Sequence, residues 1–232
     1  MSQQRLRVTF AKGPQLKYIS HLDLALAWER ALRRAGVPLA YSQGFNPQAR
    51  LQLASGLPLG STGSAEMMDV MLDGPLSPAD FTASVRPVLP AGLMLIAVEE
   101  VALKSPALQS ALRQAEYRVV VETSLPAAEL AARVADLLAA DRLEQQRVRK
   151  QQVETFDLRP LVADVRLETT APLPPQRGEF RPTGSGQAVL WMRLSAGQRG
   201  NVRPAAVLTA LGLGEADAQV ERTKLLFEFD SE

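Results

Sequence analysis

The residues best suited to chemistry in this sequence lie in one short polar segment, Tyr41–Arg50, with the sequence YSQGFNPQAR. The candidate binding residues are an aromatic pair, two amides and an arginine: Tyr41, Phe45, Gln43, Asn46 and Arg50. Aromatic rings stack on nucleobases and arginine pairs with phosphate, so the segment predicts a loop that binds nucleic acid or a partner. The alternative is an ordinary connecting loop whose two rings pack inward and whose Asn-Pro step makes a turn.

Positive charge is concentrated before and within this segment. Residues 1–50 hold eight Lys and Arg against two acidic residues, a local excess of +6 on a chain whose net charge is +1. Three of the arginines are spaced for one face of a helix: Arg30, Arg33 and Arg34. Such a patch predicts a partner that carries phosphates or carboxylates, although charge runs are also typical of a solvated face.

The single histidine, His21, follows Ser20 at the expected start of a helix. An imidazole titrates at about 6.5 and could act as a general acid or base. The sequence fixes no second catalytic group beside it, which favours a structural or substrate-orienting role. A metal site with Asp23 is rejected, because two ligands are too few and a spacing of two suits a strand better than a helix start.

Two arginines farther along the chain each precede a proline, in the motifs Asp-Leu-Arg-Pro and Asn-Val-Arg-Pro. Proline restricts the preceding residue to an extended backbone, which could aim Arg159 and Arg203 across a surface. Together with Lys150, which lies upstream of the first motif, they complete the candidate binding residues. The alternative is that Asp157 and Asn201 cap turns while both arginines are solvated.

The composition excludes several kinds of chemistry. The chain has no cysteine among its 232 residues, so it holds no disulfide, cysteine-ligated zinc, iron–sulfur cluster or catalytic thiol. It has no phosphate-binding glycine loop, dinucleotide fingerprint or nucleophile elbow, and we expect no cofactor and no metal. It has neither a signal-peptide pattern nor about 18 consecutive apolar residues, so we expect a cytoplasmic location and no membrane partner.

Hydrophobic periodicity predicts the elements that position these residues. Residues 5–10 alternate as a strand, and Ser20 caps a helix over 21–35. A strand–helix–strand–strand–helix–strand order runs to about residue 101, and a similar order with one surplus strand-like segment begins near residue 116. The predicted fold is α+β, with two tandem ferredoxin-like (βαββαβ) units and antiparallel sheets.

This order divides the chain into an N-terminal unit over 1–104, a linker over 105–115 and a C-terminal unit over 116–232. Residues 171–186 (APLPPQRGEFRPTGSG) have the composition of a flexible loop in the second unit. The basic helix and the Tyr41–Arg50 segment both belong to the first unit, which is therefore the expected place of the binding surface.

The sequence resembles a radical-SAM-associated bacterial family, most strongly over residues 5–60, on the motifs SHLD (20–23), RRAG (33–36), LAYSQGFNP (39–47), DLRP (157–160) and NVRP (201–204). In that family the domain occurs beside or fused to radical SAM proteins, often near genes for an E/G-type ribonuclease and for ribosomal proteins. The resemblance implies a radical SAM protein and RNA or a ribosomal component as partners. This chain has Gln48 where family members commonly have arginine, with Arg50 two residues on.

Three functions agree with these residues. In the first, the chain is an accessory RNA- or ribosome-binding module that presents a substrate to a separate radical SAM enzyme. In the second, it is a metal-independent RNA endonuclease-like enzyme with His21 as general acid, by analogy with CRISPR-associated nucleases of tandem ferredoxin-like fold. In the third, it is a protein–protein adaptor whose helix arginines bind an acidic face of the radical SAM partner. The charge pattern and the missing cysteines favour the first.

Overall fold

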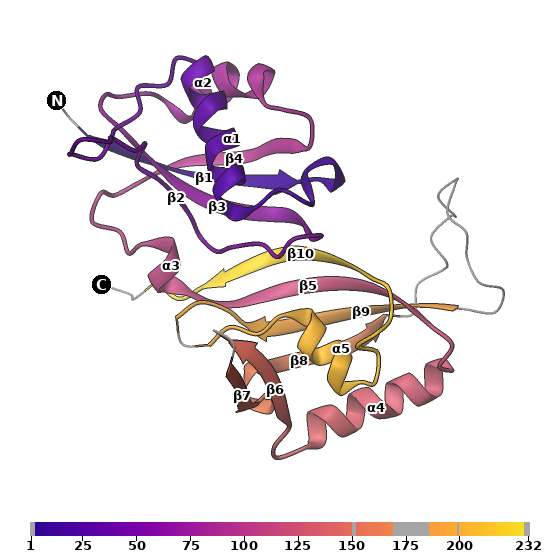
Figure 1. The fold of residues 1–232 in the computed structure, drawn as a ribbon. Helices are drawn as coiled ribbons and strands as arrows, with labels where there is room; N and C mark the ends of the chain where they lie inside the picture. Colours follow the sequence, from indigo (N-terminus) through magenta and orange to yellow (C-terminus); the bar gives the residue numbers. More distant parts are fainter. Residues whose placement is uncertain (1–2, 150–151, 169–185, 199, 230–232) are drawn as a thin grey trace. The chain divides into compact units, whose positions relative to one another are not determined.

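The computed structural model describes residues 3–149, 152–168, 186–198 and 200–229. The chain divides into two compact units, which can be followed by the sequence colouring of Figure 1. Unit 1 comprises Met1–Arg113 and Arg222–Glu232, and unit 2 comprises Gln114–Glu221. Each unit combines helices with antiparallel strand pairs, so the predicted α+β class is confirmed.

Unit 1 begins with the predicted order of strand, helix, strand, strand, helix, strand. Its elements are β1 (Gln4–Lys12), the 3-10 turn η1 (Pro14–Leu16), α1 (His21–Arg34), β2 (Leu51–Leu53), β3 (Thr62–Leu72), α2 (Pro78–Val85), the 3-10 turn η2 (Arg86–Val88), β4 (Leu93–Val101) and α3 (Leu108–Ala111). Strand β1 pairs with β4 on one edge and with β3 on the other, and β2 pairs with the far edge of β3. All three pairings are antiparallel.

The core of unit 1 lies between one face of this sheet and the helices α1 and α2. Leu6, Val8 and Phe10 alternate along β1 and are fully buried, as are Trp28 of α1 and Phe81 of α2. The rings of Phe10 and Trp28 meet edge to face, with centroids 5.0 Å apart. Burial of this apolar stripe fixes α1 against the sheet and leaves its opposite face to solvent.

Helix α1 begins where the sequence predicts, and for the predicted reason. The Ser20 hydroxyl accepts a hydrogen bond from the Asp23 N–H at 3.1 Å, and the Asp23 carboxylate accepts one from the Ser20 N–H at 3.4 Å. This reciprocal capping satisfies two backbone groups at the helix start. The helix ends at Arg34, and Gly36 then adopts a positive φ of 71°, which glycine tolerates best.

Unit 2 contains further antiparallel strand pairs and a separate two-stranded hairpin. Its elements are β5 (Leu112–Thr123), α4 (Ala127–Ala139), β6 (Glu144–Arg149), β7 (Gln152–Asp157), the 3-10 turn η3 (Arg159–Leu161), β8 (Val162–Glu168), β9 (Gly186–Ser195), α5 (Pro204–Ala210) and β10 (Ala218–Phe227). Strand β9 pairs with β5 and with β8, and the start of β10 lies beside β5. The surplus strand expected in this half is β6. It pairs with β7 in a separate two-stranded sheet, and β7 was not predicted from the sequence.

Three other expectations concern the linker, a loop of the second unit and membrane spans. Residues 105–115, the expected linker, contain α3 and the start of β5, and Leu108 and Leu112 are fully buried. The expected loop 171–186 lies outside the described residues except for Gly186, which begins β9. In the part of the chain that the structure describes, no helix has both the length and the apolar composition to cross a bilayer.

Candidate nucleic-acid interface

The Tyr41–Arg50 segment forms a small hairpin in unit 1. Tyr41 and Ala49 make an isolated antiparallel bridge at its base. Inside the bridge, the Ser42 N–H donates to the Gln48 carbonyl at 2.8 Å, and the Gln48 N–H donates to Ser42 Oγ at 2.9 Å. These bonds hold the base of the hairpin while every residue from 41 to 48 remains exposed.

Phe45 stands fully exposed near the tip of this hairpin. Its relative exposure is 112%, and the neighbouring Gly44 has a positive φ of 131°. An exposed phenylalanine forfeits roughly 1.5–3 kcal/mol that its burial would contribute. Tyr41, at the base, is 37% exposed. The alternative in which both rings pack inward is therefore wrong for Phe45.

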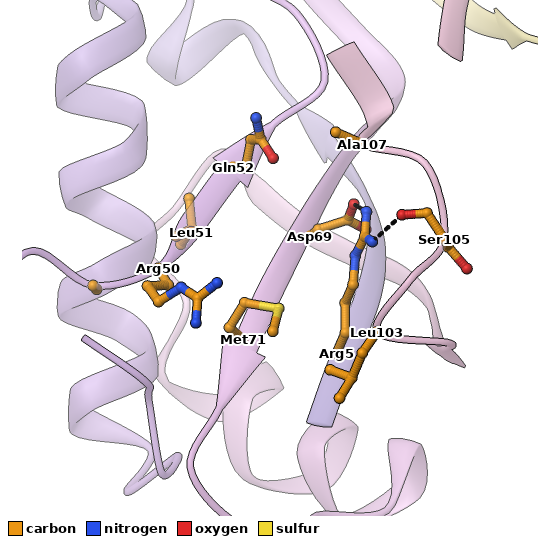
Figure 2. A pocket seen from close by; sticks show the side chains of 10 residues that line it. Arg5, Arg50, Leu51, Gln52, Asp69, Met71, Leu103, Ser105 and Ala107 are labelled. Atoms are coloured by element: carbon orange, nitrogen blue, oxygen red, sulfur yellow. Dashed lines mark hydrogen bonds and ion pairs between the residues drawn. The ribbon is translucent and has the colours of Figure 1, made fainter. Parts of the chain in front are cut away.

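Arg50, directly after the hairpin, lines an open pocket of about 440 Å³. The pocket lies on the face of the sheet opposite to α1, since its floor is formed by Arg5 and Asp69, which alternate with core residues along β1 and β3. Figure 2 shows the Arg50 side chain beside Met71, with Arg5 and Asp69 across the pocket. Its other lining residues include Ala49, Gln52, Leu103, Ser105 and Ala107. We call residues 41–52 and this pocket the hairpin–pocket surface.

Buried ion pairs fix the charged floor of the pocket. Asp69 is 3% exposed and accepts from Arg5 Nη2 at 2.5 Å and from Arg7 Nε at 2.9 Å. Arg5 also donates to the carbonyls of Ser105 at 2.6 Å and Pro106 at 3.1 Å. Two guanidiniums share one carboxylate, so the floor keeps a net positive charge whose donors are already oriented. The basic excess counted along residues 1–50 is thus partly internal.

The three arginines of the predicted basic helix, Arg30, Arg33 and Arg34, lie on the exposed face of α1. Arg33 comes within 4.0 Å of Glu29, and Arg34 donates to the Val88 carbonyl at 3.5 Å. Contacts this exposed contribute about 0–1 kcal/mol and exchange readily for another partner. Because α1 covers the other face of the sheet, these arginines form a separate basic strip and do not line the pocket.

His21 is exposed at the first residue of α1. Its Nδ1 lies 3.9 Å from the place that a Cβ would take at Gly56, so the ring sits beside the loop of residues 55–60. Within the described ranges, no side chain forms a hydrogen bond or ion pair with the imidazole. The structure therefore gives His21 no second acid–base group among the described residues.

The three candidate cations outside this region differ in their surroundings. Lys150 lies outside the described residues. Arg159 begins a 3-10 turn instead of the extended segment that its Arg-Pro motif predicts, and it donates to the carbonyls of Leu138 at 2.9 Å and Val162 at 2.7 Å. Arg203 has the expected extended backbone, with φ −99° and ψ 151°, and is exposed before α5. Arg159 therefore serves the interior of unit 2, and Arg203 remains accessible.

Sequence reasoning missed a second buried charge cluster, formed by Lys12, Glu66 and Arg222. Arg222 donates to the two carboxylate oxygens of Glu66 at 2.8 and 2.5 Å, and also to the carbonyls of Ser55 at 3.3 Å and Gly56 at 3.1 Å. Burial lowers the pKa of the neighbouring Lys12, whereas the charge of Glu66 raises it and that of Arg222 lowers it further. Glu66 and Arg222 lie 156 residues apart, so no local pattern reveals this support for the 55–60 loop.

Comparisons with known proteins identify a family and a structural likeness. A family model described as an uncharacterized protein conserved in bacteria, DUF2344, matches residues 5–204. No curated protein matches the chain.

Among solved structures, a Cbf5-Nop10-Gar1 complex is similar with 11% identity and a TM-score of 0.50, over 95% of this chain and 48% of that chain. An archaeal box H/ACA sRNP Nop10-Cbf5 complex is similar with 10% identity and a TM-score of 0.48, over 95% and 47%. This chain spans about half the length of those proteins, and the likeness to the first of them concerns the fold alone.

Proposed function

We propose that this chain, which belongs to the DUF2344 family of uncharacterized bacterial proteins, is an RNA-binding module that presents its RNA to a separate radical SAM enzyme. The RNA would bind at the hairpin–pocket surface, and a further part of the same RNA would contact the basic strip of α1 on the other face of the sheet. The chemical step would belong to the partner enzyme.

The observation that carries this proposal is the fully exposed Phe45 on the hairpin that leads into Arg50. Stacking of a base on an aromatic side chain contributes about 1–3 kcal/mol, and an exposed ring is what such stacking requires. The Arg50 side chain is exposed, and no contact within the described residues occupies its guanidinium. It is therefore available for a charge-assisted hydrogen bond to phosphate.

The distribution of charge supports two exposed basic regions, the hairpin–pocket surface with Arg50 and the separate basic strip of α1. Arg7 and Lys12 are buried and do not line the pocket, whereas Arg5, which is also buried, forms part of the pocket floor. The exposed arginines that remain in the first fifty residues are Arg30, Arg33, Arg34 and Arg50. Phosphate contacts from these residues would release counterions, so the affinity for RNA should fall steeply with salt.

The radical SAM partner is supported by the family resemblance, and the composition says which polypeptide would hold its cluster. Iron–sulfur clusters are held mainly by cysteine thiolates, and this chain has no cysteine. In a radical SAM reaction the cluster would therefore be ligated by another polypeptide. This division of labour favours a binding role for the chain described here.

The arrangement of strands supports two ferredoxin-like units as the scaffold of this function. In unit 1 the order across the sheet is β4, β1, β3, β2. In unit 2 it is β10, β5, β9, β8, with the β6–β7 hairpin inserted between α4 and β8. In both orders the first strand of a βαββαβ series lies between the third and the fourth, as a split βαβ arrangement requires.

The test is binding of the purified full chain to size-fractionated cellular RNA at two salt concentrations. The double variant Phe45→Ala/Arg50→Ala should lose at least about tenfold in affinity, the sum of one stacking and one phosphate contact. Wild type should bind less tightly at the higher salt. Equal, salt-independent binding by both proteins would contradict the proposal.

The other two functions give different outcomes in the same experiment. An adaptor would bind no RNA at either salt but would bind the radical SAM protein through Arg33 and Arg34. An endonuclease would lose RNA cleavage in His21→Ala while its affinity for RNA stayed nearly intact.

A further inference from the structure

We infer that the pocket beside the hairpin is a site for a single nucleotide of the bound RNA, with the base inserted between apolar walls and its phosphate at Arg50. This inference rests on the proposed function and deepens it by naming what the pocket takes. The cavity of about 440 Å³ is within the range of roughly 300–1,000 Å³ typical of small-molecule sites.

The floor of the pocket is preorganised. Arg5 and Asp69 are 7% and 3% exposed, and their mutual bond is supplemented by the Ser105 and Pro106 carbonyls on one side and by Arg7 on the other. Groups held this way lose little conformational freedom when a ligand arrives. A fixed cationic floor favours an anionic ligand over a neutral or cationic one.

The mouth of the pocket carries the groups that remain free to bind. Arg50 is exposed, lines the pocket and lies beside Met71 (Figure 2). Gln52 is exposed and stands opposite Asp69 in the β2–β3 register, so its amide belongs to the same face as the floor. A glutamine amide both donates and accepts, which suits the edge of a nucleobase, whereas a guanidinium suits phosphate.

The walls are apolar enough to hold a planar ring. Met71 of β3 lies on one side, and Leu103, which is 50% exposed, lies on the segment after β4. An inorganic phosphate would use Arg50 and leave these walls in water. A nucleotide would cover these walls and would also bind Gln52. It would therefore contact more of the lining residues than an anion alone.

The test uses the full chain with its methionine methyl groups labelled with ¹³C, titrated with AMP, GMP, CMP and UMP and followed by NMR. The signal of Met71 should shift on addition of at least one nucleotide, and that of Met192, which is buried in unit 2, should not. Gln52→Leu should weaken this binding about three- to tenfold, since one hydrogen bond to the base is lost. Gln52 is exposed, so the variant keeps the fold; Ala107→Phe, which fills the pocket, should abolish the shift.

The outcomes separate this inference from the proposed function. A Met71 shift produced equally well by inorganic phosphate or ribose 5-phosphate would overturn base insertion. Binding of RNA oligonucleotides that depends on Phe45 but leaves Met71 unmoved would overturn the pocket assignment and leave RNA binding intact. Nucleotide-dependent shifts that Gln52→Leu weakens, without any binding of oligonucleotides, would support the pocket ligand and remove the RNA-presenting function.

Discussion

Tyr41 and Ala49 face each other in a single antiparallel bridge, and this one pairing places exposed Phe45 and pocket-lining Arg50 on the same small hairpin. The hairpin is short and held by few bonds, yet its base is attached to β3 of the sheet. The Ala40 N–H donates to the Met71 carbonyl at 2.9 Å, and the Met71 N–H donates to the Arg50 carbonyl at 3.0 Å. An aromatic ring for stacking and a cation for phosphate are thereby carried by a rigid scaffold. This is the arrangement that the following predictions test.

Replacing Phe45 with alanine should weaken RNA binding about five- to 150-fold, the equivalent of ~1–3 kcal/mol for one stacked base. The melting temperature should not fall, because the fully exposed ring contributes no core contacts. Fluorescence anisotropy and a thermal melt measure the two effects. Tyr18→Ala is the matched control, since Tyr18 is an exposed aromatic residue outside the hairpin, at 73% exposure. Equal losses in both variants would contradict a specific role for the hairpin.

The double variant Arg33→Ala/Arg34→Ala should reduce the dependence of affinity on salt. Each phosphate contact contributes roughly 0.7–0.9 to the slope of log affinity against log salt, so the slope should become less steep by about 1.4–1.8. Binding isotherms at four salt concentrations measure it. The control is Arg142→Ala/Arg166→Ala in unit 2, whose side chains are 68% and 70% exposed, as Arg33 is at 67%. A slope changed equally by the control would show that any surface arginine suffices.

Replacing Arg222 with methionine should destabilise the protein by about 3–5 kcal/mol, because Glu66 would remain buried without its main partner. The side chains of Arg222 and Glu66 are only 2% and 4% exposed. Urea unfolding gives the free-energy difference. Arg113→Met removes a more exposed pair with Glu228 and should cost less than about 1 kcal/mol. A similar small cost for both variants would mean that the buried pair is not a principal support of unit 1.

The stability of the protein should depend on pH through Lys12. Burial lowers the folded-state pKa of Lys12, so between that pKa and the unfolded value of about 10.4 the unfolded chain binds more protons. The contribution of Lys12 to the free energy of unfolding therefore rises with pH across that window. Below the window, the buried charged amine destabilises the folded state. The free energy of unfolding of wild type minus that of Lys12→Met should increase as pH is raised. A difference that is constant or that decreases would contradict the direction given for this pKa.

Features that depend on local sequence could be predicted well. Ser20 and Asp23 are three residues apart, and their reciprocal hydrogen bonds placed the start of α1 to the residue. A similar local rule holds at α2, where Ser77 caps the helix start and Pro78 is the first helical residue. This helix ends at Val85, since the chain passes at Arg86 into a 3-10 turn that contains a proline.

Features that depend on contacts between distant segments could not be predicted. Arg5 and Asp69 are 64 residues apart, and the alternation of β1 alone would place Arg5 on a solvated face. The pocket consequently escaped prediction, although one of its residues, Arg50, was a candidate. Gln52 and Met71 are ordinary strand residues until the β2–β3 register places them around the same cavity. The direction of the Arg159 side chain could not be predicted for the same reason, because carbonyls from α4 and β8 determine it.

The most direct test of the proposed RNA surface is photocrosslinking of the full chain to RNA that contains 4-thiouridine, followed by trypsin digestion and mass spectrometry. Cleavage after Arg34 and Arg50 yields one peptide, residues 35–50, that contains the whole hairpin. The proposal predicts that this peptide carries the main crosslink and that Phe45→Ala removes most of it. Crosslinks confined to peptides of unit 2, or none under conditions in which RNA is bound, would contradict it.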